Sequence, residues 1–214
     1  MKNSTKDTAS KPIAYKFGGA FFCEMPFYVN KHVLIPRFDT ETLVEQVLKT
    51  PPCRVLDMCT GSGCIAVVLA KHGFDVTACD VSRAALRVAK KNAKLHGADI
   101  RFIRSDMFED IDGNFDVIVC NPPYIRTSEI GKHDKSILFE PRLAQDGGTD
   151  GLDYYRTFAG TAGQSLCPGG RVFLEIDKDA AKEVKSILRL GGFCDIQIIK
   201  DKANNERVVR AIKK

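Results

Sequence analysis

The chain has 214 residues, of which 44% are hydrophobic and 28% are charged, and its formal net charge is +5. This length suits one domain, and the longest purely apolar run, Cys64 to Ala70, is too short to cross a membrane. The polar start of the chain has no apolar segment typical of a secretory signal or an anchor, so we expect a cytoplasmic protein without membrane attachment.

The basic residues and the cysteines indicate no special class of site. Lysines and arginines are spread along the chain, which permits nucleic-acid binding but does not indicate it. The eight cysteines are scattered singly and form no CxxC pair. Because most of them fall in predicted strands or helices, they are expected to act as small apolar residues, and no metal site is predicted.

The first 33 residues are predicted to be a polar lead and a short cover segment. Residues 1 to about 16 are polar and expected to be frayed, whereas residues 17–33 are rich in aromatics and glycine and could hold one or two short strands over a face of the domain. The main domain is predicted to span residues 34–214. Its first helix places Leu43, Val44, Val47 and Leu48 on one face, with Asp39 or Thr40 as N-cap and Pro51-Pro52 as its end.

From residue 54 onward, predicted strands and helices alternate. Strands are expected at residues 54–58, 75–79, 100–104, 115–120, 171–176, 193–200 and 206–212, the last two forming a hairpin. Helices are expected at residues 64–71, after the N-cap Ser82 to near Gly97, at about 152–166 and at 179–190. This order predicts an α/β fold with a doubly wound, mostly parallel sheet and an antiparallel edge. The long connection from Ile125 to Gly151 is expected to be functional or mobile.

The strand at residues 115–120 leads directly into Asn121-Pro122-Pro123-Tyr124. The two prolines fix the backbone and contribute no N–H, so this turn is a rigid, acceptor-rich tip at the carboxyl end of a strand, where open α/β sheets bind ligands. The side-chain oxygen of Asn121 and the carbonyl of Pro122 could each accept one hydrogen of a planar NH2 group, with Tyr124 against its flat face. The competing interpretation is a turn that only ends the strand.

A glycine-containing loop follows the strand at residues 54–58. Its residues Asp57, Cys59, Thr60, Gly61, Ser62 and Gly63 stand between a strand and a helix, where the backbone can approach a ligand closely. Asp57 would repel a pyrophosphate but suits a cationic ligand such as an amino-acid ammonium, which favours S-adenosylmethionine over NAD. A turn needed only for tight strand-to-helix packing is the alternative.

Two further acids are predicted to end neighbouring strands. Asp80 lies 23 positions after Asp57, where a carboxylate can accept both ribose hydroxyls, and Val81 follows it. Asp106 could receive the adenine amine, with Met107 or Phe108 over the ring. Alone, Asp80 could be a helix cap and Asp106 a solvated acid. Together with Asp57 and Asn121, these acids place polar groups at four successive strand ends.

The order of five motifs resembles the HemK/PrmC family of release-factor glutamine methyltransferases. The motifs are Ile-Pro-Arg-Phe-Asp-Thr-Glu (35–41), Asp-Met-Cys-Thr-Gly-Ser-Gly (57–63), Asn-Pro-Pro-Tyr-Ile (121–125), Phe-Glu-Pro-Arg (139–142) and Asp-Gly-Gly (146–148). The resemblance covers about residues 17–214 and implies a seven-stranded, Rossmann-like class I methyltransferase sheet with S-adenosylmethionine as cofactor and S-adenosylhomocysteine as product.

The resemblance also implies an acceptor and the residues that hold it. The acceptor would be the glutamine amide of a Gly-Gly-Gln motif in a peptide-chain release factor or another protein that exposes this motif. Its NH2 would be held by Asn121 and Pro122, next to Pro123 and Tyr124, and the peptide would be admitted by a rim of Arg37, Phe38, Glu41, Glu140 and Arg142. A salt-bridged surface is the alternative interpretation of this rim.

The chain departs from the family pattern at several places. The separate N-terminal helical domain that is usual in the family is expected to be absent. Cys59 stands where glycine is usual, Phe38 where proline is common, and Asn204-Asn205 in a turn where glycine is typical. Two other functions remain open at this point: methylation of an exocyclic amine of adenine or guanine in RNA or DNA, and a catalytically silent module that binds a nucleoside and a partner.

Overall fold

Two short strands, β3 (Arg54–Met58) and β6 (Phe115–Cys120), pair in parallel at the centre of a seven-stranded sheet. The computed structural model describes residues 11–132 and 134–214. The sheet order is β5-β4-β3-β6-β7-β9-β8, with β4 at Asp75–Asp80, β5 at Ile100–Arg104, β7 at Leu166–Glu175, β8 at Phe193–Lys200 and β9 at Glu206–Lys213. The antiparallel pairing lies at the β8 end of the sheet, where β9 runs against both β7 and β8. The predicted fold class is confirmed.

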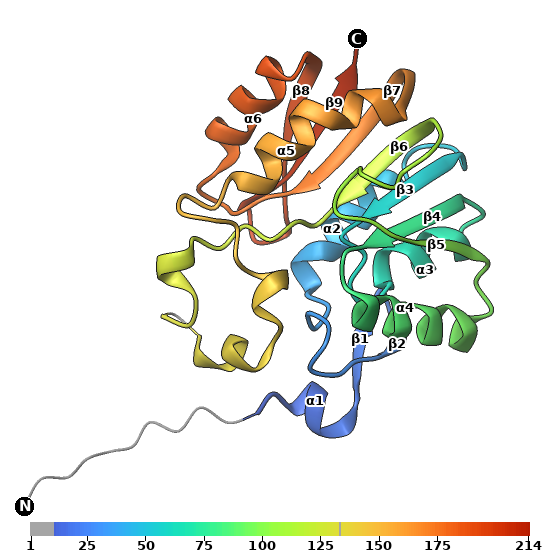
Figure 1. The fold of residues 1–214 in the computed structure, drawn as a ribbon, viewed down its shortest axis with the longest axis vertical. Helices are drawn as coiled ribbons and strands as arrows, with labels where there is room; N and C mark the ends of the chain where they lie inside the picture. The colour runs from blue at the N-terminus through green and yellow to red at the C-terminus, as the bar shows by residue number, and fades with distance from the viewer. Residues whose placement is uncertain (1–10, 133) are drawn as a thin grey trace, which may run out of the picture.

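Side chains alternate between two cores along the central strands, because successive residues of a strand point to opposite faces. Val55, Val117 and Val119 pack with α2 (Phe38–Val47) and α3 (Cys64–Lys71) on one face, which α4 (Arg83–His96) extends. Leu56 and Ile118 pack on the opposite face with α5 (Asp153–Thr161) and α6 (Ala181–Leu190). The runs of β-branched residues in the sequence therefore correspond to strands covered on both faces (Figure 1).

The cover segment forms one short helix and one hairpin. The helix α1 spans Ile13–Phe17, and the strands β1 (Gly19–Phe22) and β2 (Met25–Tyr28) pair antiparallel. The prediction of one or two short strands is confirmed, whereas the prediction of a frayed lead is wrong for the helical residues 13–16, and residues 1–10 lie outside the described part. The Asn92 side chain joins this hairpin to the domain: it accepts from Tyr28 N at 2.8 Å and donates to Ser62 O at 2.8 Å. We propose that the cover segment and residues 34–214 act as one unit.

Several boundaries differ from those predicted: β4, β7, α6 and β9 each begin or end one to five residues away from the predicted positions, and the differences at α2 and α5 change the interpretation most. The helix α2 has Arg37 in extended conformation at its N-cap position, so Asp39 and Thr40 lie inside the first turn and do not cap it. The helix α5 ends at Thr161 and continues as a 3-10 turn, η4 (Ala162–Ser165), into β7, which begins at Leu166. Two glycines, Gly160 and Gly163, lie near this point and weaken a regular helix.

The described part of the connection from Ile125 to Gly151 contains three 3-10 turns and lies at the end of the sheet where the parallel strands finish (Figure 1). The turns are η1 (Thr127–Glu129), η2 (Lys135–Phe139) and η3 (Arg142–Ala144). A parallel bridge between Ile125 and Asp146 closes its base. Within the described ranges 11–132 and 134–214, the structure contains no helix that is long and apolar enough to cross a membrane.

Candidate active site

A cavity opens at the carboxyl ends of β3, β4, β5 and β6. The sheet order reverses its direction between β3 and β6, which is the position where doubly wound sheets bind ligands. The empty space between its walls, including the part open to solvent, is about 950 Å³. Its walls come from four strand ends, the cover segment, α2, the 125–151 connection and α5; among the lining residues are Val33, Pro36, Thr40, Cys59, Gly61, Asp80, Val81, Asp106, Met107, Asn121, Pro123, Leu143 and Tyr154.

The loop after β3 is held in place by backbone contacts. The Thr60 N–H donates to Cys79 O and the Gly61 N–H donates to Asp80 Oδ2, both at 2.9 Å. A Cβ added at Gly63, whose φ is +79°, would lie 2.9 Å from the Cβ of Ala89 in α4, so this glycine is required for helix packing. Thr60, Gly61 and Ser62 line the cavity, as does Cys59, which has a φ of 59°. This left-handed backbone explains why glycine suits the Cys59 position better.

Asp57 lies beneath this loop and is not among the residues that line the cavity. It is fully buried, and its Oδ2 accepts from the Thr60 hydroxyl at 2.6 Å and from Ala66 N at 3.2 Å. Its Oδ1 is buried and has no hydrogen-bond partner among the described residues. Burial raises the pKa of this carboxyl to about 7. Asp57 therefore anchors the loop, and its direct contact with a cofactor ammonium stays a prediction.

Asp80 and Asp106 both line the cavity, as their places at the ends of β4 and β5 predict. Asp80 Oδ1 accepts from Ser82 N at 2.8 Å, and burial raises the pKa of the Asp80 carboxyl. The Ser82 hydroxyl accepts from Ala85 N at 3.2 Å and caps α4, as predicted. Asp106 is exposed and Met107 is buried beside it. The proposed ribose and adenine contacts are therefore sterically open.

Some residues of the Asn121–Tyr124 tip line the cavity, and the others lie in the protein interior. Asn121 and Pro123 line the cavity, whereas Pro122 is buried and neither it nor Tyr124 is a lining residue. The Asn121 amide donates from Nδ2 to the Thr40 hydroxyl at 3.2 Å. The Tyr124 hydroxyl donates to Glu175 Oε1 at 3.1 Å, so its ring is held by the network below the cavity rather than presented as a free stacking surface.

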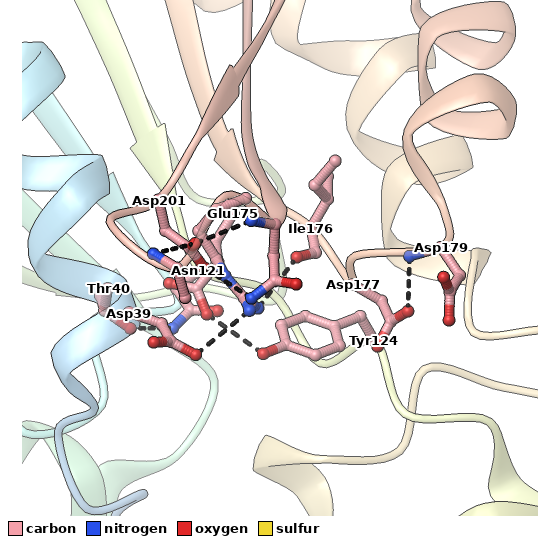
Figure 2. A network of polar contacts seen from close by, with 12 residues as sticks. Asp39, Thr40, Asn121, Tyr124, Glu175, Ile176, Asp177, Asp179 and Asp201 are labelled. Carbon is pink, nitrogen blue, oxygen red and sulfur yellow. Dashed lines mark hydrogen bonds and ion pairs between the residues drawn. The ribbon is translucent and has the colours of Figure 1, made fainter.

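Figure 2 shows this network, in which Asn121, Thr40, Glu175 and Tyr124 lie next to one another. Glu175 ends β7 and is almost fully buried, and burial raises its pKa to about 6 although the hydrogen bond from Tyr124 and the charge of Arg207 oppose the rise. Arg207 pairs with Asp39 at 3.1 Å and with Asp201 at 3.2 Å. These contacts connect α2, the strand ends and the β8–β9 turn behind the cavity.

The Asp-Gly-Gly segment packs directly on the tip. A Cβ added at Gly147 would lie 2.8 Å from the Cα of Tyr124 and 2.9 Å from the carbonyl oxygen of Pro123. The Ile125 and Gly147 backbones also bond, with the Gly147 N–H donating to Ile125 O at 2.8 Å. The glycine therefore permits the close approach that holds the tip.

The predicted rim residues do not all meet at one place. Arg37 lines the cavity and pairs with Glu140 at 2.7 Å, which ties the start of α2 to the 125–151 connection. Phe38 is 78% exposed beside it. Glu41 accepts from Cys23 N at 2.8 Å and so holds the cover hairpin, and Arg142 pairs with Asp146 at 3.0 Å in the wall of a neighbouring groove. Of the predicted rim, only Arg37 lines the cavity itself.

Comparisons with known proteins agree with this geometry. Residues 37–147 match the family model of the methyltransferase small domain. A release factor glutamine methyltransferase of Geobacter sulfurreducens is 40% identical over 205 residues, which are 93% of this chain and 72% of that protein. The chain belongs to the release factor glutamine methyltransferase family.

Solved structures place this family member among methyltransferase folds. A methyltransferase from Pyrococcus furiosus superposes with a TM-score of 0.67 at 19% identity, covering 87% of this chain and 88% of that one. The Mtq2–Trm112 complex of E. cuniculi, described as responsible for methylation of the eRF1 translation termination factor, gives 0.62 at 22% identity, with 86% and 99% covered. At these identities the likeness concerns the fold alone.

Sequence reasoning about this family member missed one layer of the site. The sequence pattern indicates Thr40 only as a possible helix cap and as part of the 35–41 motif, and it predicts no role for Glu175 or Arg207. One signal was available: Glu175 ends β7 just as Asp80, Asp106 and Asn121 follow or end their strands. The hydrogen-bond partner of the Glu175 side chain, Tyr124, follows β6, 51 positions earlier in the chain, and sequence spacing does not indicate this pairing.

The donor set of the cavity fits S-adenosylmethionine. Asp80 offers a carboxylate at a strand end, the loop at Gly61 brings backbone close to the cavity, and Asp57 leaves one buried oxygen unpaired beneath this loop, outside the cavity lining. Apolar side chains such as Val81, Met107 and Leu143 complete the walls. A charged ammonium, ribose hydroxyls and an aromatic ring would each meet a matching group.

The raised pKa of Asp57 predicts that cofactor binding is linked to protons. A cationic ligand near this carboxyl favours its charged form and lowers its pKa from about 7, so binding should release protons near neutral pH. Affinity should therefore rise as pH increases from 6 to 7.5. Calorimetry in two buffers with different ionisation enthalpies measures the release. An Asp57→Asn variant should lose most of it, and unchanged release in that variant would exclude Asp57 as its source.

Proposed function

We propose that this protein transfers a methyl group from S-adenosylmethionine to a planar amide nitrogen, the glutamine side chain of a Gly-Gly-Gln motif in a peptide-chain release factor. The observation that carries this proposal is the arrangement of Asn121. Its amide NH2 is engaged by Thr40, so its Oδ1 is left as an acceptor beside the cofactor cavity. Such an acceptor suits a substrate that presents NH2.

In this proposal different residues of the site bind different parts of the cofactor. Asp80 accepts from the ribose hydroxyls, Val81 and Met107 cover the adenine, and Asp106 accepts from its amine. The loop from Cys59 to Gly63 holds the amino-acid end, with Asp57 balancing its positive charge. When bound, S-adenosylmethionine supplies a methyl group on a positively charged sulfur, which is a strong electrophile.

The Asn121–Tyr124 tip then orients the acceptor. An amide nitrogen is a weak nucleophile because its lone pair is delocalised into the carbonyl group. Asn121 Oδ1 and the Pro122 carbonyl each accept one N–H, which stabilises the positive charge that develops on nitrogen as it gains the methyl group and before it loses one proton to water. Positioning of this kind can lower a barrier by ~7 kcal/mol or more. The prolines keep these acceptors fixed because they restrict the backbone.

The acceptor is a protein in this proposal because the relatives are named as release factor glutamine methyltransferases. The electrostatics of the site agree with this choice. A groove that shares Asp106, Met107, Leu143 and Tyr154 with the cavity is lined by further acids, Glu109, Asp112, Asp146 and Asp153. Both rim arginines, Arg37 and Arg142, are paired with acids. Such a surface disfavours a nucleic-acid backbone and does not disfavour a peptide.

The test is to incubate the protein with radiolabelled S-adenosylmethionine and a ribosomal extract that contains release factors, and to separate protein from RNA afterwards. We expect the label in a protein of release-factor size and none above background in RNA. Calorimetry with S-adenosylhomocysteine and with NAD is the control, and only the former should bind. Label recovered in RNA alone would establish nucleic-acid methylation instead.

A further inference from the structure

The helix α4 concentrates the positive charge of the protein. The segment from Val81 to Ala98, which contains α4, has five lysines and arginines and no aspartate or glutamate. The whole chain has 32 basic and 27 acidic residues, so its net charge of +5 equals the charge of this one segment, and the remainder of the chain is neutral on balance. The even spread of basic residues along the sequence therefore conceals one element that is strongly charged.

Helical periodicity brings four of these five side chains into one stripe. They recur at intervals of four, three and four residues, which places them within about 60° of arc and gives the stripe a length of about 16 Å. All four are exposed, whereas six residues on the opposite side of α4 are buried. We call this stripe the basic face, and it consists of Arg83, Arg87, Lys90 and Lys94.

The charges of the basic face are not neutralised by the protein. Within residues 11–132 and 134–214, no acidic side chain forms an ion pair with any of the four. The arrangement also opposes helix formation, because like charges lie four residues apart and Arg83 occupies the first turn, at the positive end of the helix dipole. The stability of α4 therefore does not explain the basic face.

The surroundings of the basic face indicate what kind of partner it suits. The one large apolar side chain of α4 that is exposed is Leu95, whereas protein–protein interfaces have apolar, aromatic centres and few lysines. The apolar side of α4 is buried in the domain and cannot enter a membrane. No exposed aromatic ring of α4 offers a platform for unpaired bases, and the neighbouring Tyr28 ring is covered by Lys91 Nζ at 3.2 Å. These features favour a rigid array of phosphates.

We propose that the basic face binds the phosphate backbone of a nucleic-acid duplex, without reading its sequence. Each of its four cations can approach a phosphate, and release of the counterions that neutralised these phosphates drives the binding. The face is accessible, since α4 packs against β4 and β5 on the side of the molecule away from α5 and α6 (Figure 1). The bound duplex is a docking partner and not the methyl acceptor, so this inference does not depend on the proposed function.

The test is fluorescence anisotropy of a labelled RNA duplex of about 20 base pairs, titrated with the full chain at about 50 to 200 mM salt. We expect micromolar binding at the lowest salt. Four phosphate contacts predict a slope of about −3 to −4 in log K against log salt, which is roughly a hundredfold loss of affinity across the series. A DNA duplex of the same sequence should bind within a few-fold, and vesicles of phosphatidylserine and phosphatidylcholine should not bind.

Charge reversal locates the binding surface. The double variant Arg87→Glu, Lys94→Glu should weaken duplex binding at least tenfold and reduce the steepness of the salt dependence by about two units. It should melt no lower than the wild type, because each new carboxylate lies four residues from a remaining cation, Arg83 or Lys90. The matched control is Lys182→Glu, Arg189→Glu on α6, which reverses two exposed basic residues at the same spacing and changes the net charge equally. This control should bind the duplex like the wild type.

Equal losses in the two double variants would show that net charge alone attracts the duplex, and would overturn the inference. Absence of wild-type binding at the lowest salt would also overturn it, as would binding to the vesicles but not to the duplex. Neither Arg87 nor Lys94 lines the cofactor cavity, so methyl transfer to a Gly-Gly-Gln peptide should be the same in the α4 variant and the wild type. The docking surface and the proposed function can therefore fail independently.

Discussion

Asn121→Ala is expected to lower turnover by about two to three orders of magnitude. Loss of one preorganised polar group that stabilises developing charge costs ~3 to 4 kcal/mol of transition-state stabilisation. Because the two following prolines still define the turn and Gly147 still packs on it, the protein should fold. The measurement is methyl transfer to a Gly-Gly-Gln peptide at saturating cofactor, alongside thermal unfolding of the same preparation.

The pattern of effects distinguishes catalysis from a structural role. If Asn121 holds the acceptor, cofactor affinity and melting temperature should change little while turnover collapses. If Asn121 serves only to end β6, its replacement by alanine should instead lower the melting temperature and leave the folded fraction active. Near-normal turnover in the folded variant would contradict the mechanism.

Asp80→Ala is expected to weaken binding of S-adenosylhomocysteine by about two to four orders of magnitude. Hydrogen bonds to a charged group contribute about 1.5 to 3 kcal/mol each, and the carboxylate is proposed to accept from two ribose hydroxyls. The substitution also frees the N–H groups of Gly61 and Ser82, which Asp80 holds at 2.9 and 2.8 Å. Calorimetry of the variant gives the affinity directly.

The matched control for this variant is Asp75→Ala at the other end of the same strand. Asp75 is exposed and pairs loosely with Arg54 at 3.8 Å, so its loss should leave cofactor affinity unchanged. If both variants bind as tightly as the wild type, Asp80 does not contact the cofactor. If Asp80→Ala also unfolds at a much lower temperature without ligand, its loop-holding bonds account for part of the effect.

The sheet was predictable because its strands are short apolar runs bounded by turn residues. The bounds of β3, α3, β5, β6 and β8 agree with those predicted, and the Ser82 cap and the Gly97 end of α4 are confirmed. The order of motifs along the chain likewise predicted which strand ends share one cavity. These features depend on local sequence and on the alternation of strands and helices. Topology rules for such an alternation predict which strands lie next to each other in the sheet.

The parts that were missed depend on contacts between distant residues. Thr40 lies next to Asn121 across 81 positions of sequence, and Tyr124 bonds Glu175 across 51. Glu41 is charged and polar, as a residue at the rim of a site would be, but its carboxylate accepts from the backbone N–H of Cys23. Nothing in the sequence around Glu41 indicates that partner. Pairing of polar side chains from separate elements follows from packing and not from periodicity, so the second layer of the site required the structure.

The most direct test of the proposed function is mass spectrometry of a release factor incubated with this protein and S-adenosylmethionine carrying a deuterated methyl group. We expect one deuterated methyl group on the glutamine side chain of the Gly-Gly-Gln segment, and none when this glutamine is replaced by glutamate or when the protein carries Asn121→Ala. An unmodified glutamine, with cofactor binding shown by calorimetry on the same sample, would contradict the account, as would a methyl group found at any other residue.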